Sequence, residues 1–393
     1  MNKRSVPAVL AAIVVCCLLP CLLACGSQPA MGNADTPTPE PTQAPTPTPV
    51  PTPTPTPEPK NRSQTSGRVV AEGTPSRPVI VSIENSEGAR PQTGLMRADI
   101  IYEFIVESMI TRFQALFHDE YPLYAGPLRS ARYYFIDLAQ EWSAMYLHEG
   151  YGPPKGSKYH YSPKQIESKV GVYPRRGVSQ FNGYASTFSL KKGAYTDYEA
   201  KNGYRFRSRD RAAPHNLYVL VDRMAHRYYG EHTAAVRERF RFMEGVSYES
   251  GEAFQTVSLP YQNTYYPEWV QFQYSAEENL LYRYQDDARF MVRTLSADGE
   301  TYDLEQMRVQ NLIVQYVKYG RMEKDDKGRR TCELTGSGKC DYFINGRHVT
   351  GTWSRPTLED FTIYQLDDGS VVILEPGSTW VAVHPDDTPV TID

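Results

Sequence analysis

The sequence predicts an α+β fold, with a mixed N-terminal α+β domain followed by a mostly antiparallel β C-terminal domain. Segments rich in Ile, Val, Tyr and Phe, which favour strands, dominate the chain after residue 76. Ala131, Phe135, Leu138 and Trp142 recur at helical spacing. Short strands separated by turn signals fill the chain from about residue 236 to its end. About 320 residues follow the N-terminal segments, enough for two domains, and we expect these at 76–235 and 236–393.

Residues 1–25 read as a secretory signal. Three polar and basic residues precede an apolar run from Pro7 to Ala24, and the run ends in Leu22-Leu23-Ala24-Cys25-Gly26. This ending resembles the lipobox of bacterial lipoproteins, in which the cysteine is acylated and becomes the mature N-terminus. We therefore expect palmitate on Cys25 and a chain anchored by lipid to the outer, extracytoplasmic face of the cell membrane. An uncleaved membrane anchor is the alternative, because about 18 apolar residues could just span a bilayer.

Residues 26–75 form a linker of low complexity. Thr and Pro alternate from Thr36 to Pro57, a composition that favours the extended polyproline geometry. At about 3.1 Å per residue this segment could reach on the order of 70 Å. The linker therefore predicts a semi-rigid stalk that holds the folded part away from the membrane.

After an opening strand, Val79 to Ile83, the first domain shows a hairpin pattern. Ala98 to Glu107 and Ile110 to His118 read as strands, with Ser108-Met109 as a two-residue turn. In that register Phe104 lies opposite Phe113 on an apolar face. Side chains alternate across a sheet, so the other face would carry acids from one strand and basic or polar groups from its neighbour: Asp99, Glu103, Glu107, Arg112, Gln114 and His118.

Gly126-Pro127 is a break, and the residues from Leu128 to Trp142 show helical periodicity. Arg129 and Arg132 would then lie in the first helical turn. That position is unfavourable for cations, because the N-terminal end of a helix dipole is positive. Something negative should lie near both arginines, either the chain's own glutamates or an anionic ligand.

A basic stretch follows a predicted strand, Ala144 to His148, and a long polar loop. Four arginines alternate between residues 205 and 211, which would place them on one face of a strand, as on a solvated edge strand. His215-Asn216 then leads into an apolar strand from Leu217 to Val221 and a short helix from Asp222 to Tyr229.

These segments carry a resemblance to the YerB-like family of bacterial lipoproteins. It covers nearly all of the chain after the linker and implies two domains of unknown function, without a reaction. The chain departs from the family pattern after His148. The matching motifs are Arg77-Pro78-Val79, Glu84-Asn85-Ser86, Ala89-Arg90-Pro91-Gln92-Thr93-Gly94-Leu95, Ala98-Asp99-Ile100-Ile101-Tyr102-Glu103, Ile110-Thr111-Arg112-Phe113, Gly126-Pro127-Leu128-Arg129-Ser130-Ala131-Arg132, Pro214-His215-Asn216-Leu217-Tyr218, Gly336-Ser337-Gly338-Lys339 and Pro376-Gly377-Ser378-Thr379-Trp380-Val381.

The second domain reads as an antiparallel meander or small barrel. Turn signals lie at residues 286–287, 298–299, 345–346 and 368–369. An aromatic region could be ordinary β core or a platform that stacks on sugar rings; it comprises Tyr261, Tyr265, Tyr266, Trp269, Tyr274, Tyr282 and Tyr284. It is also the surface through which a scaffold protein could dock protein partners.

Cys332 and Cys340 are the cysteines left after the signal and the lipidation site. They flank what reads as a three-residue hairpin loop, which predicts a cross-strand disulfide outside the cytoplasm. A metal site that includes His348 is the alternative, but it lacks a fourth ligand. We expect no metal and no cofactor.

The composition excludes some functions and leaves others open. The net charge is −4 and the chain has no lysine run, so nucleic acid is not an expected partner. Glu103 and Glu107 lie about 13 Å apart along a strand, too far for the carboxylate pair of a glycosidase. The sequence contains no nucleophile elbow, zinc-protease motif or Walker loop. Whether the protein is an enzyme stays open.

We therefore predict that the first domain binds an anionic or carboxylate-bearing ligand of the cell envelope. In this hypothesis the anion contacts the arginines Arg112, Arg129 and Arg132. Three acids, Glu103, Glu107 and Asp99, orient these arginines. His215 and Asn216 close the far side of the site. Three alternatives remain: an internal charge network without a ligand, an enzyme acting on peptidoglycan or its precursors with Glu103 and a histidine as acid and base, and a protein scaffold.

Overall fold

In the computed structural model, residues 58–393 form one compact unit. The structure describes residues 61–71, 77–150, 187–189, 205–229, 239–261, 268–295 and 301–393. The predicted signal and most of the predicted linker lie outside these ranges, whereas linker residues 61–71 lie inside them. Within them, no helix is both long and apolar enough to cross a membrane.

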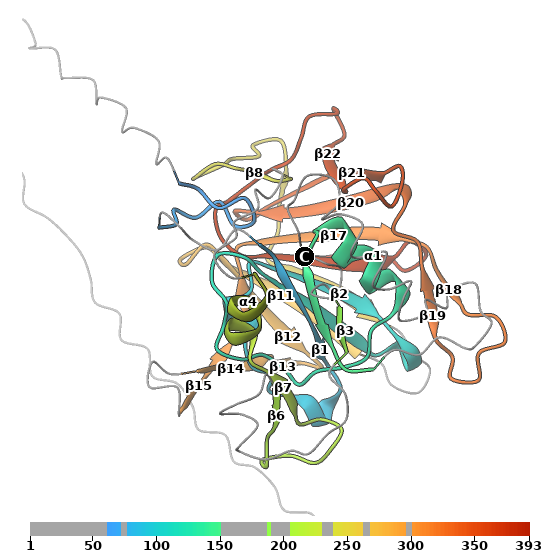
Figure 1. Ribbon diagram of the computed structural model, residues 1–393. Helices are drawn as coiled ribbons and strands as arrows, with labels where there is room; N and C mark the ends of the chain where they lie inside the picture. The colour runs from blue at the N-terminus through green and yellow to red at the C-terminus, as the bar shows by residue number, and fades with distance from the viewer. Residues whose placement is uncertain are drawn as a thin grey trace, which may run out of the picture. The chain divides into compact units, whose positions relative to one another are not determined.

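An eleven-stranded sheet runs through the molecule (Figure 1). Its path is β22-β21-β20-β17-β24-β2-β3-β1-β4-β5, and β9 pairs with β21. Strands from both predicted domains contribute to it: β1 Val79–Glu84, β2 Ile100–Ile105, β3 Thr111–Phe117, β4 Met145–His148 and β5 Thr187–Ser189, then β9 Glu252–Ala253, β17 Asn311–Val317, β20 Gly336–Ile344, β21 Arg347–Arg355, β22 Ile363–Leu366 and β24 Thr379–Pro385.

The two halves meet where β2 and β24 pair in parallel, with Ile101 beside Trp380. The backbone hydrogen bonds of one ladder therefore join a strand near residue 100 to one near residue 380. Residues on both sides of position 235 share one sheet and one core, although the exact sequence boundary between the domains stays a prediction.

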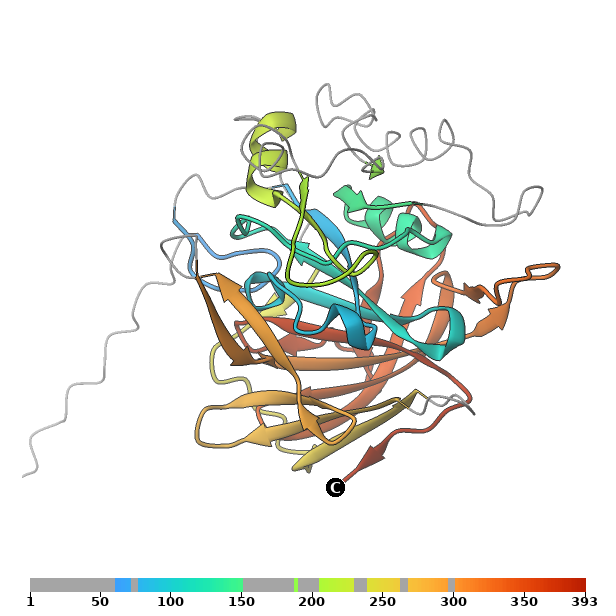
Figure 2. The same ribbon diagram turned by 90° about the horizontal axis from the view of Figure 1, so that it is seen from below.

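A second sheet of six strands packs on one face of the first (Figure 2). It follows the order β13-β12-β11-β10-β25, with β16 on β12, and comprises β10 Thr256–Tyr261, β11 Glu268–Ser275, β12 Leu280–Gln285, β13 Ala288–Arg289, β16 Arg308–Val309 and β25 Thr391–Ile392. Four two-stranded pairs account for the other described strands: β6 Arg205–Arg207 with β7 Leu217–Val219, β8 Arg241–Phe242 with β23 Ile373–Leu374, β14 Met291–Leu295 with β15 Tyr302–Gln306, and β18 Tyr319–Arg321 with β19 Arg330–Cys332.

Two hydrophobic cores lie on opposite faces of the large sheet. Ile101, Phe113 and Trp380 belong to the core that faces the second sheet. Tyr102 and Phe104 belong to the other core, which helix α1 (Tyr133–Glu141) covers. Alternation along β2 thus sends neighbouring residues into different cores.

The described helices are few and short, so the N-terminal half is β-rich rather than the predicted α+β; the β-rich C-terminal half is confirmed. Among the described residues, the α-helices are α1 and α4 (Val221–Tyr229), and the 3₁₀ turns are η1 (Glu87–Ala89), η2 (Leu95–Arg97) and η3 (Glu107–Met109). The predicted helix from Leu128 begins only at Tyr133. The residues before it are extended: Leu128 bridges Ile83, and Arg132 caps the helix with φ −125° and ψ 159°.

The hairpin register differs from the prediction by one residue. Phe104 lies opposite Arg112, and Glu103 lies opposite Phe113, because the connection is the five-residue loop 106–110 with η3 inside it. A one-residue slip moves every side chain to the other face. Glu103 and Arg112 therefore lie on opposite faces of the sheet, and the prediction that they share one face was wrong.

The positions of the turns were predicted better than the register of the hairpin. Residues 286–287 join β12 to β13, and residues 345–346 join β20 to β21; all four have positive φ, as tight hairpin turns require. Residues 368–369 also form a turn. The expected turn at 298–299 lies outside the described residues.

The predicted disulfide was wrong. Cys332 and Cys340 are buried free thiols. Cys332 pairs with Tyr319 across the β18–β19 pair, whereas Cys340 lies in the large sheet between Gln315 and Gly351. The residues between them therefore connect two different sheets and do not form a hairpin.

Candidate functional site

A pocket of about 460 Å³ lies where β1 ends and β3 begins. The loop 106–110 and two turns from more distant parts of the chain complete its wall. The lining residues are Glu84, Asn85, Ser86, Val106, Glu107, Ser108, Ile110, Thr111, Arg112, Arg129, His215 and Lys327. Four of the eight predicted ligand-binding residues are therefore brought together: Glu107, Arg112, Arg129 and His215.

Glu84, the last residue of β1, is the acid around which the pocket's polar contacts converge. Its Oε1 accepts hydrogen bonds from Ser86 Oγ (2.5 Å) and Arg129 Nη2 (2.6 Å), and it lies 2.9 Å from His215 Nδ1. Its Oε2 has no hydrogen-bond partner among the described residues, and Glu84 is only 3% exposed. One oxygen is thus saturated and the other is not.

Arg112 lies directly opposite Glu84 across the β1–β3 ladder, so both side chains are on one face. Its Nη1 donates to Ser130 O at 2.7 Å. Within the described parts of the chain, no carboxylate comes within 4.0 Å of its guanidinium nitrogens. Burial, and next the positive charge of Arg132, lower the pKa of Arg112 to about 10. Arg112 is therefore a half-buried cation without an ion-pair partner in the described structure.

Glu107 and Arg132 neutralise each other beside the pocket. Arg132 Nη2 and Glu107 Oε1 form an ion pair, and Arg132 Nη1 also donates to Ala131 O at 2.7 Å. Burial alone would raise the pKa of Glu107, but the charges of Arg132 and Arg112 hold it below its usual value. Arg132 is thus an internal ion-pair partner, not an open position for a ligand.

Arg129 and His215 reach the pocket from two segments that flank β7. Leu128 N donates to Leu217 O, and this bond holds the two segments together. Arg129 is bonded to Glu84 Oε1 with its side chain 27% exposed, and His215 Nδ1 lies 2.9 Å from the same oxygen with its side chain 29% exposed. Both residues therefore keep part of their surface open to the pocket.

Glu103 lies on the far side of the sheet. It is fully buried, its Oε1 lies 2.8 Å from Arg283 Nη2, and its Oε2 accepts from Trp380 Nε1 at 3.1 Å. The guanidinium of Arg283 also lies 4.0 Å from the ring of Phe290. The role predicted for Glu103, orienting the three arginines, is not what this geometry shows: Glu103 joins the large sheet to the second sheet.

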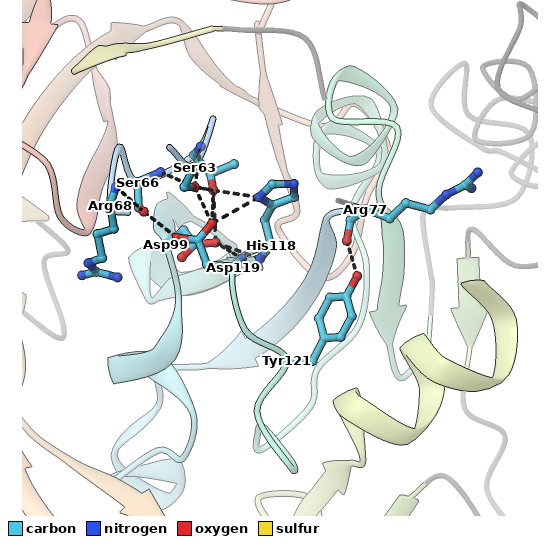
Figure 3. A network of polar contacts seen from close by, with 9 residues as sticks. Ser63, Ser66, Arg68, Arg77, Asp99, His118, Asp119 and Tyr121 are labelled. Atoms are coloured by element: carbon cyan, nitrogen blue, oxygen red, sulfur yellow. Dashed lines mark hydrogen bonds and ion pairs between the residues drawn. The ribbon is translucent and has the colours of Figure 1, made fainter. Parts of the chain in front are cut away.

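Asp99 belongs to a third polar cluster (Figure 3). Its Oδ2 accepts from the backbone N of His118 (2.8 Å) and of Asp119 (3.0 Å), and from Thr65 Oγ1 (3.2 Å). Asp119 in turn accepts from Ser63 Oγ and from Ser66 Oγ. The cluster therefore fastens the segment 61–71, which lies within the predicted linker, to the open end of the β2–β3 hairpin.

The same cluster has the spacing of metal ligands. One ligand atom from each of Asp99, His118 and Asp119 lies within 4.8 Å of the others. Carboxylate and imidazole are ligands that divalent cations accept. The hydroxyl groups of the segment 61–71 already use these carboxylates as acceptors, so we assign the cluster a structural role.

Asn216 also lies away from the pocket. Its Nδ2 donates to Ser208 O (2.9 Å) and Arg211 O (3.0 Å), and its Oδ1 accepts from Arg207 Nη1 (2.6 Å). It therefore shapes the turn that presents His215. The strand β6 covers only Arg205–Arg207, so the four alternating arginines do not share one strand face.

A larger groove of about 1140 Å³ lies at the other end of the large sheet. It contains the Gly336-Ser337-Gly338-Lys339 motif, together with Lys318 and Trp353. His348, the suggested metal ligand, lies 2.9 Å from Asp341 Oδ1. In the aromatic region, Tyr261 is fully buried core, whereas Trp269 is 43% exposed.

Sequence reasoning missed Glu84, Ser86 and Lys327. Glu84 ends β1 and Ser86 follows two residues later, and the end of a strand is where side chains often form sites, so that signal was available. Lys327 comes from the distant β18–β19 connection, and no local pattern indicates that it approaches the pocket.

Comparisons with known proteins agree with this architecture. Residues 65–234 match the N-terminal domain, and residues 257–381 the C-terminal domain, of a protein family of unknown function, DUF3048. The candidate lipoprotein YerB of Bacillus subtilis (strain 168) is 30% identical over 318 residues, which cover 80% of this chain and 82% of YerB. A crystal structure of the YerB protein from Bacillus subtilis matches with a TM-score of 0.64 at 24% identity, over 85% of this chain and all of that one. The chain therefore belongs to the DUF3048 family, with both its N-terminal and its C-terminal domain.

Proposed function

We propose that this protein is a lipoprotein, anchored through Cys25 to the outer face of the cell membrane, which binds an anionic or carboxylate-bearing ligand of the cell envelope in the pocket beside β1 and β3. The lipid anchor is supported by the sequence Leu22 to Gly26 and by the name of the relative YerB.

Arg112 is the observation that carries the binding proposal. It lines the pocket and donates one hydrogen bond, to a neutral carbonyl. A guanidinium has five donors in a planar fork, which suits a carboxylate or a phosphate group. Removing a charge from water is costly unless a counter-charge is near. An anion bound at Arg112 would supply that counter-charge.

The rest of the pocket supports the same class of ligand. Lys327 and Arg129 add positive charge, and Thr111 and Ser108 add polar groups to the wall. A volume of about 460 Å³ lies within the range of small-molecule sites, roughly 300–1,000 Å³. The pocket is therefore large enough for one polar group of a wall component or for a small free anion.

Calorimetric titration of residues 58–393 with acetate and with inorganic phosphate tests the proposal. We expect both anions to bind the wild type and to bind Arg112→Gln about ten-fold or more weakly, since a charged hydrogen bond contributes roughly 1.5–3 kcal/mol. Arg289→Gln is the matched control, because Arg289 is exposed and lies outside the pocket. The proposal is contradicted if Arg112→Gln binds the anions as tightly as wild type and Arg289→Gln do, or if neither anion binds wild type.

Acid–base chemistry on the ligand is a second candidate function, favoured by the contact between Glu84 and His215. A carboxylate at Nδ1 holds an imidazole in place and leaves Nε2 to exchange a proton. This candidate replaces Glu103, the acid expected from the sequence, with Glu84. Mass spectrometry of purified sacculi incubated with the protein tests it. Soluble products that form with wild type but not with His215→Gln support an enzyme. If wild type releases no soluble products from the sacculi, this candidate function is rejected.

A further inference from the structure

Only one of the two carboxylate oxygens of Glu84 has hydrogen-bond partners among the described residues. Three groups approach Oε1, namely Ser86 Oγ, Arg129 Nη2 and His215 Nδ1, while Oε2 has no hydrogen-bond partner in the described structure. Glu84 is nevertheless 97% buried and lines the pocket. A buried acceptor without a donor is unfavourable, so Oε2 is a position where a donor from a ligand would be stabilised.

Arg112 offers the opposite chemistry next to it. Glu84 and Arg112 are cross-strand partners in the antiparallel β1–β3 pair, which places their side chains side by side on one face. They do not neutralise each other: Glu84 pairs with Arg129 and His215, and Arg112 donates to Ser130 O. An acceptor and a fork of donors therefore line the same pocket, each with unused capacity.

From this juxtaposition we propose that the ligand group is zwitterionic, with a carboxylate that binds Arg112 and an ammonium group that donates to Glu84 Oε2. The end of an amino acid, free or attached to a larger wall component, has this chemistry. A simple anion would satisfy Arg112 but leave Oε2 without a donor and lie close to a carboxylate of like charge. An amine alone would leave Arg112 without an anion.

This inference rests on the proposed anion site, and a panel of small probes separates the two. Titration of residues 58–393 with glycine, acetate and methylammonium compares the zwitterion with each of its halves. We expect glycine to bind at least ten-fold more tightly than either acetate or methylammonium. Glu84→Gln removes the negative charge and should reduce the affinity for glycine to that for acetate. Circular dichroism would establish that this variant is folded, and the probe comparison on wild type decides the question if it is not.

Each outcome has one meaning. Acetate that binds wild type as tightly as glycine overturns the zwitterion and leaves the anion site intact. Methylammonium that binds as tightly as glycine overturns both, because the pocket would then select the amine. Failure of all three probes, together with phosphate, also rejects both. Glycine binding that Glu84→Gln leaves unchanged, in a folded variant, excludes Glu84 as the acceptor and overturns the inference.

Discussion

Two buried or half-buried arginines illustrate how differently one residue type can be used in this molecule. Arg283 is completely buried, and its charge is matched by Glu103 and by three aromatic rings. Arg112 is half-buried and has no such partner in the described structure. The first arrangement stabilises the packing of two sheets, whereas the second leaves a half-buried cation without a counter-charge among the described residues.

The Glu103–Arg283 pair should be essential for stability. Arg283→Met leaves the Glu103 carboxylate buried with Trp380 Nε1 as its remaining side-chain donor. Breaking a buried pair on one side costs about 3–5 kcal/mol of unfolding free energy. Urea denaturation would measure the change, with Arg289→Gln, expected within about 0.5 kcal/mol of wild type, as the exposed control. A loss below 1 kcal/mol for Arg283→Met would show that the pair is not needed.

Asp99 should make stability depend on pH. Burial, and next the charge of Asp119, raise the pKa of Asp99 to about 7, from 3.8. The folded state therefore binds more protons than the unfolded state between about pH 4 and 7, so the contribution of Asp99 to stability decreases as pH rises through that window. The pKa of Asp119 is instead held below its usual value, so its contribution is lost at lower pH.

The comparison of wild type with Asp99→Asn isolates this effect. Burial lowers the pKa of His148 and of His384 to about 4, so both histidines destabilise the fold on acidification, but they are present in both proteins. We expect the unfolding free energy of wild type minus that of Asp99→Asn to fall by up to about 1.4 kcal/mol per pH unit from pH 4 to 7. A difference that stays flat or rises over this window would contradict the assignment.

At the scale of elements, the sequence predicted strands better than it predicted how they pair. The opening strand, both hairpin strands and the strand that ends at His148 were predicted from the sequence, the first three from their Ile, Val, Tyr and Phe content. The turn at Asn345-Gly346 was found because tight hairpins need positive φ. The β2–β3 connection has no such marker. Its left-handed residue is Ser108, with φ 58°, and the resulting one-residue slip misplaced Glu103.

The candidate site shares this pattern of success and failure. Arg112, Arg129, Glu107 and His215 were predicted from local charge patterns and do line one pocket. Arg132 and Asn216 were also charged or polar and nearby, but only the three-dimensional contacts reveal that their partners are internal. Pairings such as Glu103 with Arg283 span 180 residues, and no local pattern specifies them.

The segment 61–71 should depend on Asp119 for its attachment. Asp119 accepts hydrogen bonds from Ser63 Oγ and Ser66 Oγ. A hydrogen bond from a hydroxyl group to a charged acceptor contributes roughly 1.5–3 kcal/mol to stability. Asp119→Ala should therefore increase hydrogen exchange in residues 61–71, measured by mass spectrometry, while the strands of the large sheet keep their protection. Asp368→Ala, a change in an exposed turn, is the control. Unchanged exchange in Asp119→Ala would show that other contacts hold the segment.

At the scale of the whole molecule, the two domains that the family comprises do not have separate sheets. The parallel pair of β2 and β24 lies at the centre of the eleven-stranded sheet, so either half alone would expose a central strand edge and half of each core. Exposed central edges favour aggregation. The pocket is lined by residues of both halves, Arg112 and Lys327 among them, so it likewise needs both.

Residues 58–235 and 236–393 should accordingly fail to fold as separate fragments. We expect each fragment to lack a cooperative thermal transition, and residues 58–393 to unfold in one transition, because the sheet and both cores are shared. Circular dichroism and calorimetry of the three proteins would measure this. Two independent transitions, or a fragment that unfolds cooperatively by itself, would contradict the shared core.

Co-sedimentation of residues 58–393 with purified cell-wall sacculi, prepared with and without their covalently linked anionic polymers, would show whether the pocket beside β1 and β3 binds the cell wall. We predict that wild type and Arg289→Gln pellet with the sacculi, that folded Arg112→Gln stays in solution, and that the dependence on the polymers names the class of ligand. If Arg112→Gln pellets as wild type does, or if wild type does not pellet with either preparation, the pocket does not bind the cell wall and the proposed function is wrong.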